Sequence, residues 1–182
     1  MAVLVAAVIL LGGLVVLNLL LTGAIIRRLR VMAREPYRGD PATPGLPVGA
    51  EVPALSAAAT DGATITSEYL RGRHTLLGFF NTDCGTCRTT APAFARAARD
   101  LTAATDGTGR AVAVISTEQE DAAELLAALG TDVTVIMERG RGPVTDAFQM
   151  SAFPWFLLIG PDGRITASAS TPERCLPAPA RA

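Results

Sequence analysis

The sequence predicts an α/β fold, in which helices flank a central mixed β-sheet and one N-terminal transmembrane helix precedes the domain. Three observations lead to this prediction. Short apolar runs alternate with helical patterns downstream of residue 48. The pair Cys84 and Cys87, in C-x-x-C spacing, stands between an apolar run and a helical pattern. Residues 2–26 carry no charged side chain.

The uncharged N-terminal stretch, residues 2–26, predicts a transmembrane anchor. As a helix it would extend roughly 38 Å, enough to cross an apolar layer of about 30 Å with some tilt. A cleaved secretory signal is the alternative. It fits less well, because no basic segment precedes the apolar run and the run exceeds the usual length of such signals.

Residues 27–47 form a basic linker that is rich in proline and glycine. The linker contains Pro36, Pro41, Pro44 and Pro47, a composition typical of a semi-extended spacer. The remaining residues, 48–182, are enough for one domain with a substantial core. A formal net charge of −1 gives no support for nucleic-acid binding. All sixteen basic residues are arginine, which we attribute to composition rather than to recognition.

The domain begins with extended segments. Segments 54–59 and 64–65 flank Asp61-Gly62 and predict a hairpin, and a helical turn is expected at 67–70. Residues 75–80 are almost wholly apolar, as in a buried central strand. The helical pattern that follows places one set of side chains on an apolar face: Cys87, Ala91, Phe94, Ala95, Ala98 and Leu101.

Strands and helices alternate in the second half of the domain. The expected elements are a strand at 111–115, a helix at 122–129, a strand at 133–137, a short helix at 143–148 and an antiparallel pair at 155–159 and 165–169. Thr117 and Glu120 are predicted to form a capping box for the first helix, and Gly130 to end it. After Ala169, three prolines limit the chain to one or two helical turns.

The C-x-x-C pair predicts redox chemistry. A helix N-terminus presents unpaired N–H groups and a partial positive charge, which favour a thiolate at Cys84. Cys87 lies on the same helical face, within reach for a disulfide. A zinc site would need His74, the only histidine, together with Cys175, and a purely structural cystine is the other alternative. We expect no metal.

Two segments resemble the thioredoxin superfamily, in particular its membrane-anchored TlpA-type and MauD-like thiol–disulfide oxidoreductases. The first is Cys84-Gly-Thr-Cys87-Arg-Thr-Thr-Ala-Pro92, which is similar to the family's active-site helix with its internal proline. The second is Ser151-Ala-Phe153-Pro154-Trp, which resembles the family's cis-proline loop. The resemblance covers about residues 48–169. The helix and strand near 122–137 resemble the α/β insertion of such domains.

The resemblance implies specific roles for these residues. Cys84 would attack a disulfide, Cys87 would resolve the mixed disulfide, and Pro154 would follow a cis peptide bond beside them. Gly85, Thr86 and Phe153 would line the substrate groove. The implied partners are client proteins that carry disulfides or thiols and an unidentified electron donor, and no cofactor is implied.

Three residues depart from the family pattern. Asp83 replaces the usual tryptophan before the first cysteine, and its charge would either disfavour a thiolate at Cys84 or serve in proton transfer. Gly78 stands where the family has a buried carboxylate. Phe153 is bulky and would narrow the groove. The direction and rate of exchange therefore stay open.

Two alternative functions use the same thiols. A peroxiredoxin would require P-x-x-x-T-x-x-C, but Leu77 and Asn81 occupy the proline and threonine positions. A copper-binding or haem-pathway module would hold Cu(I) between the thiolates, with His74 as the available imidazole. Cys175 is interpreted as a spare thiol in a flexible tail.

Two features of the sequence favour opposite sides of the membrane for the domain. Arg27, Arg28, Arg30 and Arg34 follow the span and favour a cytoplasmic domain. The TlpA-type resemblance favours the extracytoplasmic face. We expect the extracytoplasmic face, because large domains translocate with limited regard to flanking charge.

Overall fold

The computed structural model describes residues 1, 4–5, 10–14, 18, 43–118 and 122–176. The chain forms two compact units, Met1–Arg38 and Gly39–Ala182, which are described separately. Most of the predicted anchor (2–26) and of the linker (27–47) lies outside the described residues. Among those that are described, no helix is both long and apolar enough to cross a bilayer.

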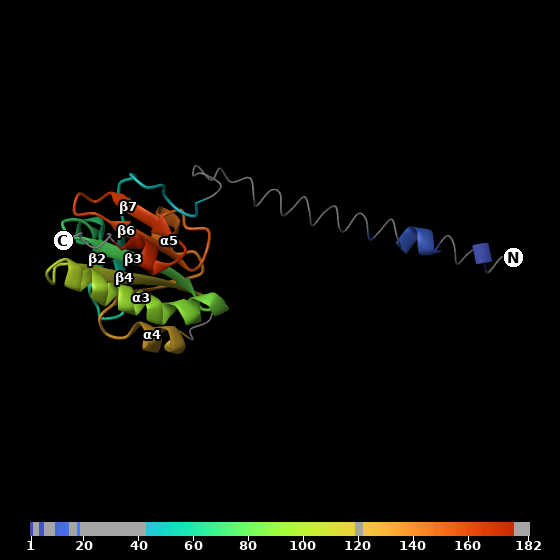
Figure 1. The fold of residues 1–182 in the computed structure, drawn as a ribbon. Helices are drawn as coiled ribbons and strands as arrows, with labels where there is room; N and C mark the ends of the chain where they lie inside the picture. Colours follow the sequence, from blue (N-terminus) through green and yellow to red (C-terminus); the bar gives the residue numbers. More distant parts are fainter. Residues whose placement is uncertain (2–3, 6–9, 15–17, 19–42, 119–121, 177–182) are drawn as a thin grey trace. The chain divides into compact units, whose positions relative to one another are not determined.

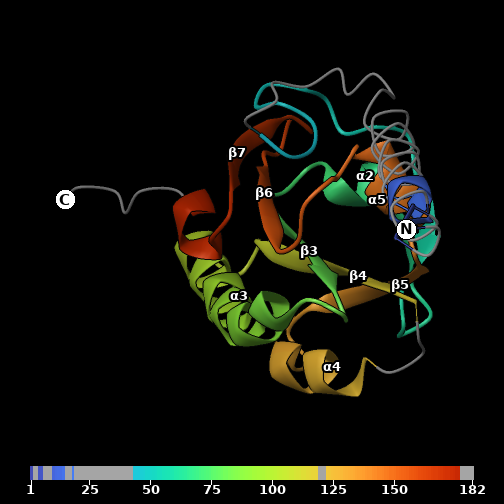
Figure 2. The ribbon, with the colours of Figure 1, turned by 90° about the vertical axis from the view of Figure 1, so that its right-hand side faces the viewer.

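The second unit is built on a five-stranded mixed sheet with the order β5-β4-β3-β6-β7 (Figures 1 and 2). The strands are β3 (Thr75–Asn81), β4 (Arg110–Thr117), β5 (Thr134–Arg139), β6 (Trp155–Ile159) and β7 (Ile165–Ala169). The first three are parallel to one another, while β6 is antiparallel to both β3 and β7. The predicted mixed sheet is therefore confirmed, with β3 at its centre.

Helices cover both faces of this sheet, as predicted. On one face lie α3 (Gly85–Ala104), α4 (Ala123–Leu129) and the one-turn 3₁₀ helix η1 (Pro172–Cys175). On the other lie α2 (Ser67–Leu70) and α5 (Pro143–Ala147). Alternate residues of β3 point to opposite faces: Leu76 and Phe80 pack beneath α3, and Leu77 and Phe79 pack towards α5.

The opening hairpin consists of β1 (Ser56–Ala58) and β2 (Thr64–Thr66), an antiparallel pair as predicted. Beyond β1, the Thr60 N–H donates to the Val135 carbonyl of β5 at 2.8 Å. At the opposite edge of the sheet, Ile165 of β7 donates its N–H to the Ala50 carbonyl at 2.9 Å. Short segments from the start of the domain thus border both edges of the sheet.

The N-terminal boundary of α4 differs from the prediction. Thr117 does not cap this helix, because it is the last residue of β4 and its buried hydroxyl accepts a hydrogen bond from Thr82. The helix begins at Ala123, and its N-cap residue, Ala122, makes no side-chain capping bond. The predicted capping role of Thr117 is therefore wrong, and Glu120 lies outside the described residues. Gly130 ends the helix as predicted, with a φ of 69°.

Cys175 was expected in a flexible tail, and this expectation is wrong. The Cys175 side chain is 1 % exposed and belongs to the core beneath α3. Its Sγ–H donates to the Phe156 carbonyl of β6 at 3.4 Å. The apolar character of a thiol explains this placement, since free cysteine is among the most buried residue types.

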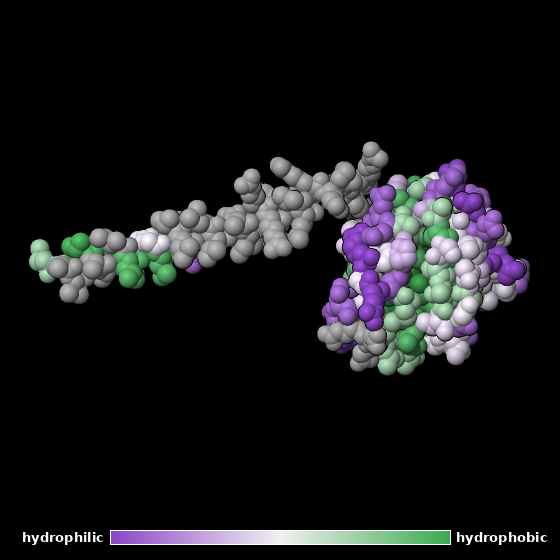
Figure 3. Space-filling view, turned by 180° about the vertical axis from the view of Figure 1, so that it is seen from behind, coloured by the Kyte–Doolittle hydropathy of each residue, from purple (hydrophilic) through white to green (hydrophobic). Residues whose placement is uncertain are grey.

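The arginines of α3 lie on the surface of the domain, where two of them form exposed ion pairs with neighbouring acids. Arg88 pairs with Glu124 at 3.3 Å and Arg99 pairs with Asp132 at 3.7 Å. Seen from behind, hydrophilic residues flank a band of apolar surface (Figure 3). Exposed pairs of this kind contribute little to stability, so these arginines form a solvated face of α3.

An aromatic cluster joins α3 to the sheet. Phe94 of α3 stacks on Phe156 of β6 at 5.6 Å and meets the edge of Phe80 of β3 at 5.4 Å. Gly78 makes room for this cluster: a Cβ atom on Gly78 would lie 2.6 Å from the Phe94 ring and 2.9 Å from the Phe80 ring. The space that a buried carboxylate would need is therefore filled by aromatic carbon.

We expect Gly78→Ala to reduce the free energy of unfolding by about 1–3 kcal/mol, because the added methyl group overpacks the cluster. Urea denaturation of the reduced protein measures this change. Gly85→Ala is the matched control, because a Cβ at this helical position meets nothing within 4 Å, and it should stay within about 1 kcal/mol of the wild type. Equal stability of the two variants would contradict the packing argument.

Candidate functional site

The site lies where β3 leads into α3. Cys84 is the N-cap residue of α3, in extended conformation, and makes no side-chain capping bond. The Cys87 N–H donates to the Cys84 carbonyl at 3.0 Å, while the N–H groups of Gly85 and Thr86 are available to a negative charge on the Cys84 sulfur. Cys84 is partly exposed, whereas its neighbours Gly85 and Thr86 are exposed. This arrangement fits the predicted role of Cys84 as the attacking thiol.

Cys87 lies one turn further along α3 and is fully buried, at 0 % exposure. Burial raises the pKa of the Cys87 thiol to about 12, and this effect is partly offset by the Asn81 N–H, which donates to its sulfur at 3.4 Å. The adjacent Cys84 adds to the increase in pKa. The two thiols therefore differ in kind: one is accessible, and the other is held protonated inside the domain.

The loop before β6 approaches the first cysteine, although the two are far apart in sequence. The Phe153–Pro154 peptide bond is cis, which confirms the prediction for Pro154. The Cys84 Sγ–H points at the Phe153 carbonyl, with 3.5 Å between the sulfur and the oxygen. Phe153 is half-buried, and its side chain packs against the cores on both faces of the sheet. The bulky Phe153 side chain is thus partly buried against the core.

A tight turn at Asn81 sets the direction of the chain into the site. The Asn81 side-chain oxygen accepts the Asp83 N–H at 2.7 Å, and its backbone carbonyl accepts the Cys84 N–H at 3.2 Å. With the bond from its own N–H to Cys87, Asn81 contacts both halves of the dithiol. Sequence reasoning missed this role, although an asparagine at the end of a strand is a recognised turn former.

Asp83 lies beside Cys84 in this turn, and its side chain is exposed. Its carboxylate makes no hydrogen bond or ion pair with any residue that the structure describes. Arg88 braces the same turn from α3, because its guanidinium donates to the Thr82 carbonyl at 3.0 Å while pairing with Glu124. The residue pattern gave no indication of this contact with the turn.

The other candidate ligands lie away from the dithiol. His74 precedes β3, whereas Cys84 follows it, so a strand of about 20 Å separates them. No group of three or more Cys, His, Asp or Glu side chains that could hold a metal ion occurs among the described residues. Cys175 lies in the core next to β6 rather than at the surface.

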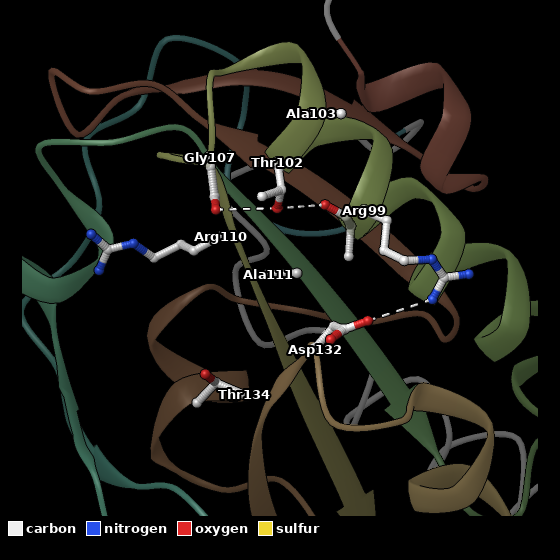
Figure 4. A pocket seen from close by; sticks show the side chains of 10 residues that line it. Arg99, Thr102, Ala103, Gly107, Arg110, Ala111, Asp132 and Thr134 are labelled. Atoms are coloured by element: carbon white, nitrogen blue, oxygen red, sulfur yellow. Dashed lines mark hydrogen bonds and ion pairs between the residues drawn. The ribbon is translucent and has the colours of Figure 1, made fainter.

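A hollow of the domain lies at the far end of α3 from Cys84. It has a volume of about 640 Å³, and Arg99 and Asp132 form an ion pair at its side (Figure 4). Its lining consists mostly of small residues, including Ala103, Gly107 and Ala111. The hollow contains no thiol, and it plays no part in the dithiol site.

Because two thiols are buried, we predict that the free energy of unfolding of the reduced protein decreases at alkaline pH. Burial raises the pKa of Cys175 from 9.0 to about 12, as it does for Cys87. The folded protein therefore keeps these protons, while the unfolded chain loses them above about pH 9. The stabilisation is complete below pH 9 and is lost as the pH rises towards 12. The chain contains no lysine, so few other groups titrate in this range.

In Cys175→Ala, we expect the free energy of unfolding to decrease less steeply between pH 9 and 12 than in the wild type. The difference in slope should reach at most about 1.4 kcal/mol per pH unit, the value for one proton. Urea unfolding of reduced protein across this range provides the measurement. Cys84→Ala is the control, because Cys84 is partly exposed. Parallel slopes for wild type and Cys175→Ala would contradict the prediction.

Comparison with known proteins supports the same fold. The sequence profile of the redoxin family matches residues 47–175. No curated protein matches the chain in sequence.

Many solved structures share the fold. The thioredoxin domain of a thiol-disulfide oxidoreductase from Bacteroides vulgatus is 20 % identical, with a TM-score of 0.55 over 68 % of this chain and 88 % of that one. A thiol:disulfide interchange protein of the thioredoxin family from Chlorobium tepidum is 19 % identical, with a TM-score of 0.56 over 71 % and 92 %. A secreted disulfide oxidoreductase from Mycobacterium tuberculosis is 16 % identical, with a TM-score of 0.52 over 68 % and 88 %.

At these identities the solved structures establish the fold alone, and the family follows from the profile match. That match spans β1 to η1 and so includes Cys84, Cys87 and the cis-proline loop. The chain therefore belongs to the redoxin family, within the thioredoxin superfamily.

Proposed function

We propose that this protein is a membrane-tethered thiol–disulfide oxidoreductase that exchanges disulfides with client proteins through Cys84 and Cys87. Its family and its dithiol make it a thioredoxin-like oxidoreductase. The tether, the protein clients and an electron donor that recharges the dithiol are the further parts of the proposal. The uncharged segment 2–26 supports the tether.

One observation carries the proposal: an accessible and a buried thiol lie one helical turn apart, beside a cis-proline loop. Cys84 at the start of α3 is open to a substrate, and the Phe153 carbonyl lies 3.5 Å from its sulfur. Cys87 is fully buried directly behind it. A substrate can therefore reach one sulfur only, which imposes an order on the two steps of exchange.

In the first step, the Cys84 thiolate attacks one sulfur of a client disulfide. A mixed disulfide forms, and the other client sulfur leaves as a thiolate. In the second step, Cys87 loses its proton and attacks the Cys84 sulfur, which releases the second client thiolate. Two electrons pass to the client, whose two sulfurs are protonated, and Cys84 and Cys87 become a disulfide.

The second step requires an acceptor for the Cys87 proton, because burial raises its pKa to about 12. Gly78 supplies no carboxylate, and the space around it is filled by Phe94. We infer that the thiolate released by the client takes this proton, or that Asp83 does so from the rim of the site. The exposed position of the Asp83 side chain is compatible with the second route.

The proposed order of attack predicts which variant accumulates an intermediate. With a synthetic peptide disulfide, full-length Cys87→Ser should form a stable mixed disulfide at Cys84, because the resolving thiol is missing. Cys84→Ser should form none, and its rate of disulfide reduction should decrease at least about a hundredfold, the scale typical of a lost nucleophile. Peptide mass mapping identifies the linked cysteine.

Cys175→Ala is the control for this experiment, since Cys175 lies in the core next to β6. It should turn over the peptide disulfide at the wild-type rate and trap nothing. A mixed disulfide that formed at Cys87 in the Cys84→Ser variant would contradict the assignment of the two thiols. Failure of the wild type to reduce any disulfide would contradict the proposed function.

We place the domain on the extracytoplasmic side of the membrane. A reporter enzyme that is active only outside the cytoplasm, fused after Ala182, should be active. Deletion of residues 2–26 should leave the fusion protein in the soluble fraction. Activity of a cytoplasm-only reporter at the same position would reverse the assignment, in agreement with Arg27, Arg28, Arg30 and Arg34.

A further inference from the structure

A layer of buried polar side chains lies where β3, β4 and β5 end, which is the end of the sheet that carries the dithiol. Among the described residues, six polar side chains are buried. Five of them lie at this end of the sheet: Thr82, Ser116, Thr117, Glu138 and Thr145. Buried polar groups are costly unless they are paired, so such a layer specifies one arrangement of the elements that it joins. Glu138 carries the only carboxylate of these five.

Glu138 is 5 % exposed and holds the first turn of α5. One carboxylate oxygen accepts the Val144 N–H at 2.6 Å. The other accepts the Thr145 N–H at 3.1 Å and the Thr145 hydroxyl at 2.7 Å. With only five residues, α5 is too short to be stable by itself. The side chain of a neighbouring strand thus supplies the cap that this helix requires.

The sequence of α5 is adapted to this contact. Its N-cap residue, Gly142, has no side chain that could cap the helix. A Cβ on Gly142 would lie 2.5 Å from the carboxyl carbon of Glu138. Because Gly142 has no side chain, the Glu138 carboxylate has room beside it. Of Gly142 and Glu138, only Glu138 caps the helix.

The segment after α5 connects this cap to the dithiol. The Met150 N–H donates to the Thr145 carbonyl at 2.9 Å, and the Phe148 ring packs on Phe79 of β3 at 5.6 Å. Three residues after Met150, the Phe153 carbonyl meets the Cys84 sulfur at 3.5 Å. The position of this carbonyl therefore depends on where α5 is held.

We propose that Glu138 is a positioning residue for the loop that contains Phe153 and Pro154, which we call the client-binding loop. Glu138 acts on this loop through α5 and not on the thiols. This inference rests on the proposed function and adds to it that client chains bind beside Phe153, one of the residues expected to line the substrate groove. The side chain of Glu138 lies on the α5 face of the sheet, as its contacts show, whereas Cys87 belongs to the core on the α3 face. All three donors of the α5 cap point at its oxygens, so it is engaged in holding the loop.

The test compares two disulfides with the pre-reduced, full-length protein in detergent micelles. Each rate is followed over a single turnover at a range of disulfide concentrations, so that KM is the half-saturating concentration and kcat the limiting rate. A synthetic peptide disulfide of about ten residues requires the loop for binding, whereas the small aromatic disulfide DTNB needs only an accessible Cys84. In Glu138→Gln, an amide group replaces one acceptor oxygen with a donor. We expect KM for the peptide to increase about tenfold, a factor that corresponds to about 1.4 kcal/mol. kcat for the peptide and the rate with DTNB should stay within about twofold, since the thiols are untouched.

Substitutions at Thr145 provide a matched pair should Glu138→Gln fold poorly. Thr145→Val removes the hydroxyl that donates to Glu138 and should raise KM for the peptide about threefold. Thr145→Ser keeps the hydroxyl and should restore the wild-type KM. Amide hydrogen exchange over residues 143–154 should be faster in Glu138→Gln and Thr145→Val, and unchanged in Thr145→Ser.

Three results would overturn the inference. An unchanged KM for the peptide in folded Glu138→Gln and Thr145→Val would show that the cap does not set the loop. Equal loss of rate with the peptide and with DTNB would show a general effect on the fold. A wild-type protein that reduces neither disulfide would refute the proposed function and this inference with it, whereas in the first two cases the proposed function would stand.

Discussion

The contact between Phe94 and the backbone of Gly78 determines where α3 can lie on the sheet. The ring occupies the space above β3 that any side chain at residue 78 would fill, and Phe80 and Phe156 enclose it on the sheet side. Because interiors are close-packed, a helix held in this way has little freedom to shift along the strand. Cys84 is the N-cap of that helix and Cys87 lies in its first turn, so the site takes its geometry from the aromatic cluster below it.

This packing has a chemical consequence for the resolving thiol. The cluster places Cys87 among apolar side chains, where a thiolate is poorly solvated, and the Asn81 N–H provides only a partial offset. Redox chemistry at this site therefore depends on proton movement at the rim rather than on a base within the core. The Glu138 carboxylate lies away from Cys87, because its oxygens hold α5 on the other face of the sheet.

The parts of the fold that depend on local periodicity could be predicted from the sequence. The apolar run at β3, the turn at Asp61-Gly62 and the apolar face of α3 each reflect neighbouring residues, and each was correctly identified. The dithiol was expected from its C-x-x-C spacing at a helix start, and the cis peptide bond at Pro154 from the resemblance to a family. Cys175 was misplaced because its burial depends on η1 packing against distant strands, and no short window of sequence contains that contact.

The start of the domain borders both edges of the sheet, with Thr60 paired to β5 and Ala50 paired to β7. Unpaired strand edges are the usual template for association between copies of a chain. A protein confined to a membrane surface would meet its copies at high local density, where such association is most favourable. The bordered edges would let many copies lie side by side as independent units, so that crowding raises the local supply of dithiols without joining the sheets.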